Sequence, residues 1–176
     1  MKTLFLLRHM KSSWDNDSVP DHERPLSARG ERAAATMAEY LRRRKGGTPQ
    51  PDLILCSTAA RTRATLAGLL PLWREPPRMI VDRVFYMASA PVLAERLRAL
   101  PDAMSTVLLI GHNPGLEDLA LDLASPEVTS LRTRIMEKYP TGALARLEFA
   151  TDRWADVGAG KGHLAEFVVP RDLPAA

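Results

Sequence analysis

The chain has 176 residues, of which 45% are hydrophobic and 26% are charged. These proportions are those of an ordinary globular domain, and they exclude a disordered or fibrous protein. Lys and Arg number 24 against 21 for Asp and Glu, so the formal net charge is +3. This small excess of base suits an anionic ligand, but it does not indicate a nucleic-acid partner, and we expect none.

The single cysteine, Cys56, excludes an intrachain disulfide. The apolar run at residues 3–7 is too short for a signal peptide, and no run reaches the length that crosses a membrane. We therefore expect a cytoplasmic protein with no membrane partner, folded as one domain over residues 1–176.

Five short apolar runs predict buried β-strands. The runs at residues 3–7, 53–56 and 107–110 are nearly continuous rather than alternating, which is typical of parallel strands that are covered on both faces. Two later runs, at residues 143–149 and 164–169, have turn-rich spacers between them and predict an antiparallel edge.

Helices are predicted between these strands. The clearest begins after Ser27, a suitable N-cap, and ends before Gly46. Three others span residues 59–70, 90–100 and 116–124. The alternation of strands and helices predicts an α/β fold, a three-layer α/β/α arrangement with a mostly parallel central sheet and an antiparallel C-terminal edge.

Three polar motifs follow predicted strands, at the edge of the sheet where α/β proteins bind ligands. Arg8 and His9 follow the first strand, Arg61 lies in the helix after the second, and His112 follows the strand at residues 107–110. Each of them alone is equally typical of a surface arginine or a hydrogen-bonded histidine. Together they predict a compact cationic pocket with two imidazoles.

Such a pocket is suited to a phosphoryl group and to nucleophilic catalysis. Guanidinium groups bind phosphate oxygens, and neighbouring cations lower the pKa of an imidazole, which keeps its lone pair available for attack on phosphorus. The sequence has no spacing typical of a metal site, such as His-x-x-x-His or paired cysteines. We therefore expect neither a metal ion nor a cofactor.

These motifs resemble those of the histidine phosphatase superfamily, which has the phosphoglycerate-mutase-like fold. The resemblance spans residues 4–115, and the phrases at residues 9–14, 24–26 and 111–115 are most similar to the small SixA-type phosphohistidine phosphatase branch. The resemblance implies that His9 is the nucleophile and becomes transiently phosphorylated. It also implies that Arg8, Arg61 and His112 bind the phosphoryl group.

Two positions near the expected nucleophile depart from the family pattern. Met10 stands where the family usually has Gly, and we expect its side chain to be buried against the sheet. Asp15 stands where related mutases often carry an Asn that donates to phosphate. Because an ionised Asp cannot donate, Asp15 either turns away or acts while protonated. We expect Ser12 and Asp15 to be substrate-binding residues.

The resemblance also bears on the substrate. Larger members of the family place a Glu after the third strand to protonate an alkoxide, whereas residues 81–88 of this chain contain only Asp82. An imidazole, with a conjugate-acid pKa of about 6.5, leaves phosphorus more easily than an alkoxide. We therefore expect the partner to be a phosphorylated protein, such as a histidine phosphotransfer domain, that carries phosphohistidine, or another phosphate with a good leaving group.

Three alternatives stay open at this point. The site could hydrolyse a small phosphate ester, bind phosphorylated partners without turnover, or belong to a nucleotide-processing transferase. The last has no support from a G-x-G-x-x-G or P-loop motif. We expect a monomer or a weak dimer, since a helix face or the C-terminal edge could pair.

Overall fold

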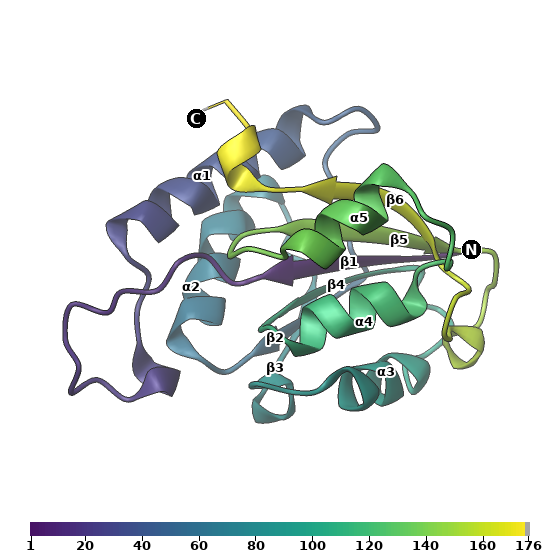
Figure 1. Cartoon of the computed structure of the whole chain (residues 1–176), viewed down its shortest axis with the longest axis horizontal. Helices are drawn as coiled ribbons and strands as arrows, with labels where there is room; N and C mark the ends of the chain where they lie inside the picture. The colour runs from purple at the N-terminus through teal and green to yellow at the C-terminus, as the bar shows by residue number, and fades with distance from the viewer. Residues whose placement is uncertain (175–176) are drawn as a thin grey trace.

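A computed structural model describes residues 1–174 of the chain and shows a mixed sheet between two layers of helices (Figure 1). The strands are β1 (Lys2–Arg8), β2 (Leu53–Ser57), β3 (Arg78–Asp82), β4 (Thr106–Gly111), β5 (Leu144–Phe149) and β6 (His163–Val168). Their order is β3-β2-β4-β1-β5-β6. The first four in that order are parallel, whereas β5 is antiparallel to β1 and β6 to β5. The predicted fold class is confirmed.

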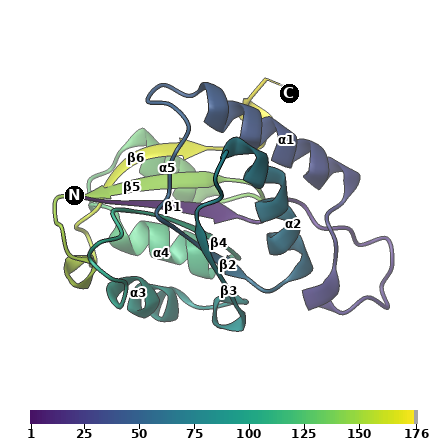
Figure 2. The same ribbon diagram turned by 180° about the vertical axis from the view of Figure 1, so that it is seen from behind.

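The helices divide between the two faces of this sheet (Figures 1 and 2). They are α1 (Ala28–Arg43), α2 (Ala60–Leu69), α3 (Ala90–Arg98), α4 (Gly115–Leu123) and α5 (Ser130–Glu137). Buried side chains of α1 and α2 pack against one face, and those of α3, α4 and α5 pack against the other. Two short 3-10 turns, η1 (Asp21–Glu23) and η5 (Pro170–Asp172), matter for the sites described below.

Strand β1 shows why the central strands are nearly continuous in apolar residues. Leu4 and Leu6 join the core beneath α3, α4 and α5, whereas Phe5 and Leu7 join the core beneath α1 and α2. Successive side chains of a strand point to opposite faces, so a strand covered on both sides needs an apolar residue at every position.

The structure contains two elements that the sequence did not predict. Strand β3 lies at the edge of the sheet with all five of its residues exposed, and its apolar run, residues 79–81, is shorter than the runs of β1, β2 and β4. Helix α5 has one buried residue, Ile135, and therefore no apolar stripe. The predicted helix after Ser27 is α1, and the Ser27 side chain accepts a hydrogen bond from the Gly30 amide, as expected of an N-cap.

The topology brings the polar motifs together. Because β1, β2 and β4 are parallel, their carboxyl ends lie at one edge of the sheet, on the left in Figure 1. The loop that carries η1 projects at the same edge (Figure 1). Within the described residues, no helix combines the length and apolar character needed to cross a membrane.

Candidate active site

His9 comes directly after β1 and is 7% exposed. Its Nδ1 lies 2.7 Å from the carbonyl oxygen of Met10. Because a carbonyl oxygen only accepts, the ring carries its proton on Nδ1 and leaves a lone pair on Nε2. Burial lowers the pKa of His9 to about 4, and the charges of Arg61 and Arg8 act in the same direction. His9 is therefore a neutral imidazole at neutral pH.

His112 lies beside His9 at the end of β4, with 5.2 Å between the ring centroids. Its Nδ1 is 3.2 Å from Nη2 of Arg61, and its Nε2 is 2.8 Å from Oγ of Ser57. A guanidinium group only donates, so Nδ1 accepts and Nε2 donates to the serine. Burial, followed by the neighbouring His9 and Arg61, lowers the pKa of His112 to about 3. This imidazole is neutral as well.

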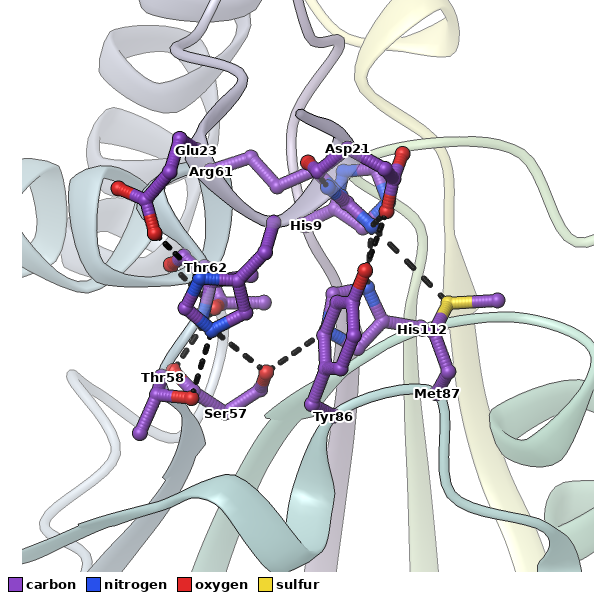
Figure 3. A network of polar contacts seen from close by, with 12 residues as sticks. His9, Asp21, Glu23, Ser57, Thr58, Arg61, Thr62, Tyr86, Met87 and His112 are labelled. Carbon is purple, nitrogen blue, oxygen red and sulfur yellow. Dashed lines mark hydrogen bonds and ion pairs between the residues drawn. The ribbon is translucent and has the colours of Figure 1, made fainter. Parts of the chain in front are cut away.

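Arg61 is buried in the first turn of α2, and the loop that carries η1 holds its guanidinium group. Nη1 donates to the backbone oxygen of Asp21 at 2.6 Å, and Nη2 lies 3.0 Å from the Asp21 carboxylate. The same carboxylate accepts a hydrogen bond of 2.7 Å from the hydroxyl of Tyr86. Figure 3 shows this network, in which Tyr86 also packs edge-on against His112. The hydrogen bond from Tyr86, with a smaller contribution from Arg61, lowers the pKa of Asp21, so its carboxylate is ionised at neutral pH.

Arg8 is the last residue of β1 and directly precedes His9. Its Nη1 donates to the backbone oxygen of Tyr139 at 2.7 Å, and its buried Nε has no partner among the described residues. Both ring systems and both arginines line one open pocket of about 310 Å³. The other lining residues are Lys11, Ser12, Trp14, Asp21, Met87, Asn113 and Thr141. Three cations, two neutral imidazoles and a single carboxylate make this pocket a receptor for an anion of the size of a phosphoryl group.

Two comparisons of sequence agree with this site. The profile of the histidine phosphatase superfamily (branch 1) matches residues 4–81, which include His9 and Arg61. The uncharacterized protein Rv1276c of Mycobacterium tuberculosis is 38% identical over 169 residues, which cover 94% of this chain and 100% of that protein. The chain belongs to the histidine phosphatase superfamily.

Solved structures place this histidine phosphatase within the superfamily. A candidate phosphohistidine phosphatase SixA from Nakamurella multipartitia superposes with a TM-score of 0.81 at 28% identity, over 96% of each chain. A second candidate of the same name, from Agrobacterium tumefaciens, superposes with a TM-score of 0.80 at 26% identity, over 96% of this chain and 98% of that one. The fold is therefore the phosphoglycerate-mutase-like fold, the chain is of the SixA type, and the protein is a phosphatase.

The structure brings most of the sequence-predicted residues of this phosphatase to one place. His9, His112, Arg8 and Arg61 line the pocket, and Ser12 lies on its wall. Their individual roles in binding and catalysis stay predictions. Asp15 does not lie among the lining residues: it is exposed, and its carboxylate accepts a hydrogen bond of 2.8 Å from Ser13. Its substrate-binding role likewise stays a prediction.

Met10 is buried as expected. Its side chain is 0% exposed and packs in the core beneath α1 and α2. Met87 is the one non-glycine residue with a positive φ in the described part of the chain, so the φ of Met10 is not positive. The position after the Arg-His pair of this phosphatase therefore does not require a glycine.

Sequence reasoning missed three side chains around the pocket. Ser57 is the last residue of β2 and contacts His112, a position that the motif after β2 could have indicated. Tyr86 follows β3, an element that was not predicted, and Asp21 lies in a loop with no periodic pattern. Asp82, the one acidic residue of the stretch 81–88, is the last residue of β3; its carboxylate accepts a hydrogen bond from the Val84 amide at the start of a 3-10 turn and does not line the pocket.

Proposed function

We propose that this phosphatase works without a metal ion, through a phosphohistidine intermediate on His9, and that its substrate is phosphohistidine in a protein. The observation that carries the proposal is the 2.7 Å hydrogen bond between His9 Nδ1 and the Met10 carbonyl oxygen. This bond leaves the Nε2 lone pair free in a pocket that is lined by Arg8 and Arg61. A neutral, oriented imidazole among cations is what attack on a phosphoryl group requires.

In the first step, Nε2 of His9 attacks phosphorus, and the bond from phosphorus to the leaving group breaks on the opposite side. Arg8 and Arg61 neutralise the charge on the phosphoryl oxygens. Arg61 then shares its guanidinium group between the phosphoryl group and Asp21, which accepts from it at 3.0 Å in the free protein. No metal ion is needed, because the arginines supply the positive charge.

His112 can donate to the phosphoryl group through a change of tautomer. In the free protein its Nδ1 accepts from Arg61 while its Nε2 donates to Ser57. A serine hydroxyl can donate as well as accept. When a phosphoryl oxygen replaces Arg61 as the partner of Nδ1, the proton moves to Nδ1 and the Ser57 hydroxyl donates to Nε2. Ser57 thus allows His112 to act as a donor without a positive charge.

In the second step, a water molecule attacks the phosphorus of phosphorylated His9 from the side that the leaving group has vacated. The bond between Nε2 and phosphorus breaks, and the electron pair returns to Nε2. The low pKa of His9 favours this departure, since the ring leaves as a stable neutral imidazole. The products are inorganic phosphate and the free phosphatase.

The substrate class follows from the acids around the pocket. Asp21 is the one carboxylic acid among the residues that line it, and Asp21 is ionised at neutral pH. The Asp82 carboxylate caps a 3-10 turn, where it accepts a hydrogen bond from the Val84 amide. An alkoxide would therefore leave without a proton, whereas an imidazole is a good leaving group. The two structural neighbours that are named as candidate phosphohistidine phosphatases support the same class.

The test compares the hydrolysis of a phosphohistidine peptide, an aryl phosphate and an alkyl phosphate by the wild type and by His9→Ala. We expect the first two substrates to be turned over, the alkyl phosphate to react at least about a hundredfold more slowly, and the variant to be inactive on all three. A chelator should leave these rates unchanged. Comparable rates on the alkyl and histidine phosphates would refute the substrate class, and loss of activity in the chelator, restored by a metal ion, would refute the metal-free mechanism.

A further inference from the structure

A second, larger cavity adjoins the catalytic pocket. It has a volume of about 470 Å³ and shares Arg8, Lys11 and Thr141 with the pocket, so the two form a continuous depression. We call it the basic groove. Its remaining lining residues are Arg29, Arg32, Ala33, Thr36, Lys138, Pro140, Val169, Pro170 and Arg171. None of the lining residues is acidic, and half of them are Arg or Lys.

Three separate segments build the basic groove. Helix α1 turns its apolar side toward the core, while Arg29, Arg32 and Thr36, spaced three and four residues apart, lie together on another side. The turn η5, which packs against α1 (Figure 1), supplies Arg171. The segment between α5 and β5 supplies Lys138. The fold thus brings cations from separate segments together, and no run of basic residues in the sequence marks the groove.

Most cations of the basic groove have no carboxylate partner among the described residues; Arg171, which lies 3.5 Å from Asp172, is the exception. Arg42 and Arg43 in the last turn of α1 pair with the same glutamate, and Arg44 pairs with Glu166. Within residues 1–174, in contrast, Lys11, Arg29, Arg32 and Lys138 have no carboxylate within 4.0 Å. Like charges that lie close together without counter-charges repel one another, so a bound anion would reduce the repulsion between these cations.

We propose that the basic groove binds acidic side chains that flank the phosphorylated residue of a protein substrate. This inference rests on the proposed function, because the flanking residues lie in the groove only while the phosphorylated side chain occupies the catalytic pocket. Four of the lining residues are apolar, namely Ala33, Pro140, Val169 and Pro170. They suit the carbon stems of Asp and Glu better than they suit a bare phosphate. The cations are also spread over three segments, as suits a row of carboxylates rather than a single compact anion.

The experiment measures kcat and KM on two phosphohistidine peptides of equal length, one with Asp and Glu beside the phosphorylated residue and one with Asn and Gln. The proteins are the wild type, Arg29→Glu/Arg32→Glu, and the matched control Arg96→Glu/Arg98→Glu. The control places the same charge change at exposed positions of α3, on the opposite face of the sheet. An aryl phosphate serves as a substrate without flanking groups.

We expect the wild type to prefer the acidic peptide by about tenfold in kcat/KM, mainly through KM, and to lose this preference as the salt concentration rises. The groove variant should lose the preference and keep its activity on the aryl phosphate, whereas the α3 control should keep both. The milder variant Arg29→Gln/Arg32→Gln should fall between them, which excludes misfolding as the cause.

Two outcomes overturn the proposal and leave the proposed function intact. They are equal rates of the wild type on both peptides, and a preference for the acidic peptide that survives in the groove variant. A phenyl phosphate that carries a second phosphate group is a further substrate in the experiment. If its kcat/KM falls more in the groove variant than that of the acidic peptide does, the groove is a site for small polyphosphates and the proposal is wrong. Turnover of the aryl phosphate with no turnover of either peptide would overturn the proposed substrate and the groove proposal together.

Discussion

The two backbone polar groups of Met10 link His9 to Thr65. The Met10 carbonyl oxygen accepts from His9 Nδ1 at 2.7 Å, and the Met10 amide donates to Thr65 Oγ1 at 2.9 Å. Thr65 in turn donates to the backbone oxygen of Arg61 at 2.7 Å. A residue on α2 therefore holds the backbone of Met10, whose carbonyl group selects the tautomer of His9, which makes Thr65 a positioning residue.

Replacement of Thr65 by Val tests this link. Valine keeps the shape of the side chain but leaves the buried Met10 amide without a partner, which should lower the free energy of unfolding by about 1–3 kcal/mol. The His9 ring is then less well held, so kcat on an aryl phosphate should fall while KM changes little. Thr65→Ser, which keeps the hydroxyl, should restore most of kcat. Denaturant unfolding and steady-state kinetics measure the two effects, and a valine variant with unchanged kcat would contradict the positioning role.

Replacement of Asp21, in contrast to replacement of Thr65, should strengthen a property of the site, namely its affinity for phosphate. Its ionised carboxylate accepts from Arg61 and Tyr86 beside the pocket, so it competes with a phosphate for Arg61. Asp21→Asn removes the charge and keeps an acceptor. Inorganic phosphate should therefore inhibit this variant about threefold to tenfold more strongly, equivalent to ~0.7–1.4 kcal/mol. The inhibition constant of phosphate measures the effect.

Glu23 provides the control for the Asp21 variant. It is a carboxylate of the same turn, it pairs with His22, and it does not line the pocket. Glu23→Gln should leave the inhibition constant of phosphate unchanged. If phosphate instead bound more weakly to Asp21→Asn, the main effect of Asp21 would be to orient Arg61.

The two pocket histidines make stability depend on pH. Burial lowers the pKa of His9 to about 4 and that of His112 to about 3, against about 6.5 in an unfolded chain. Between these values the unfolded chain binds more protons than the folded protein, so the free energy of unfolding rises with pH and levels off above about 6.5. Acidification from there toward pH 4 should therefore destabilise the protein.

Urea denaturation over this pH range measures the effect. The double variant His9→Gln/His112→Gln lacks both titrating rings, so its stability should vary less with pH across the same window. A wild type whose stability stayed constant between about pH 6.5 and pH 4 would contradict the lowered pKa values.

The sequence predicted the parts of the fold and site that a local pattern encodes. The central positions of strands β1, β2 and β4 form continuous apolar runs because both faces of these strands are covered, and parallel strands place their ends at one edge. His9, Arg61 and His112 could therefore be assigned to one crevice from their positions after strands. Cys56 lies in the core, and burial raises the pKa of its thiol to about 12.

Features that depend on long-range packing could not be predicted. Strand β3 is held at the edge by backbone pairing with β2 rather than by burial. Its apolar run covers only residues 79–81, so the strand was not predicted, and Tyr86 was missed with it. The contact of Asp21 with Arg61 joins residues 40 positions apart. The basic groove requires α1 to lie beside η5, and the sequence analysis found no signal for that contact.

The site of phosphoryl attachment tests the central claim most directly. Wild-type protein mixed with an aryl phosphate and quenched in alkali during turnover should carry one phosphoryl group on Nε2 of His9, as identified by mass spectrometry of the peptide and by phosphorus NMR. His9→Gln should carry none. A phosphoryl group on another residue or on Nδ1, or continued turnover with no phosphorylated protein at any time, would contradict the account.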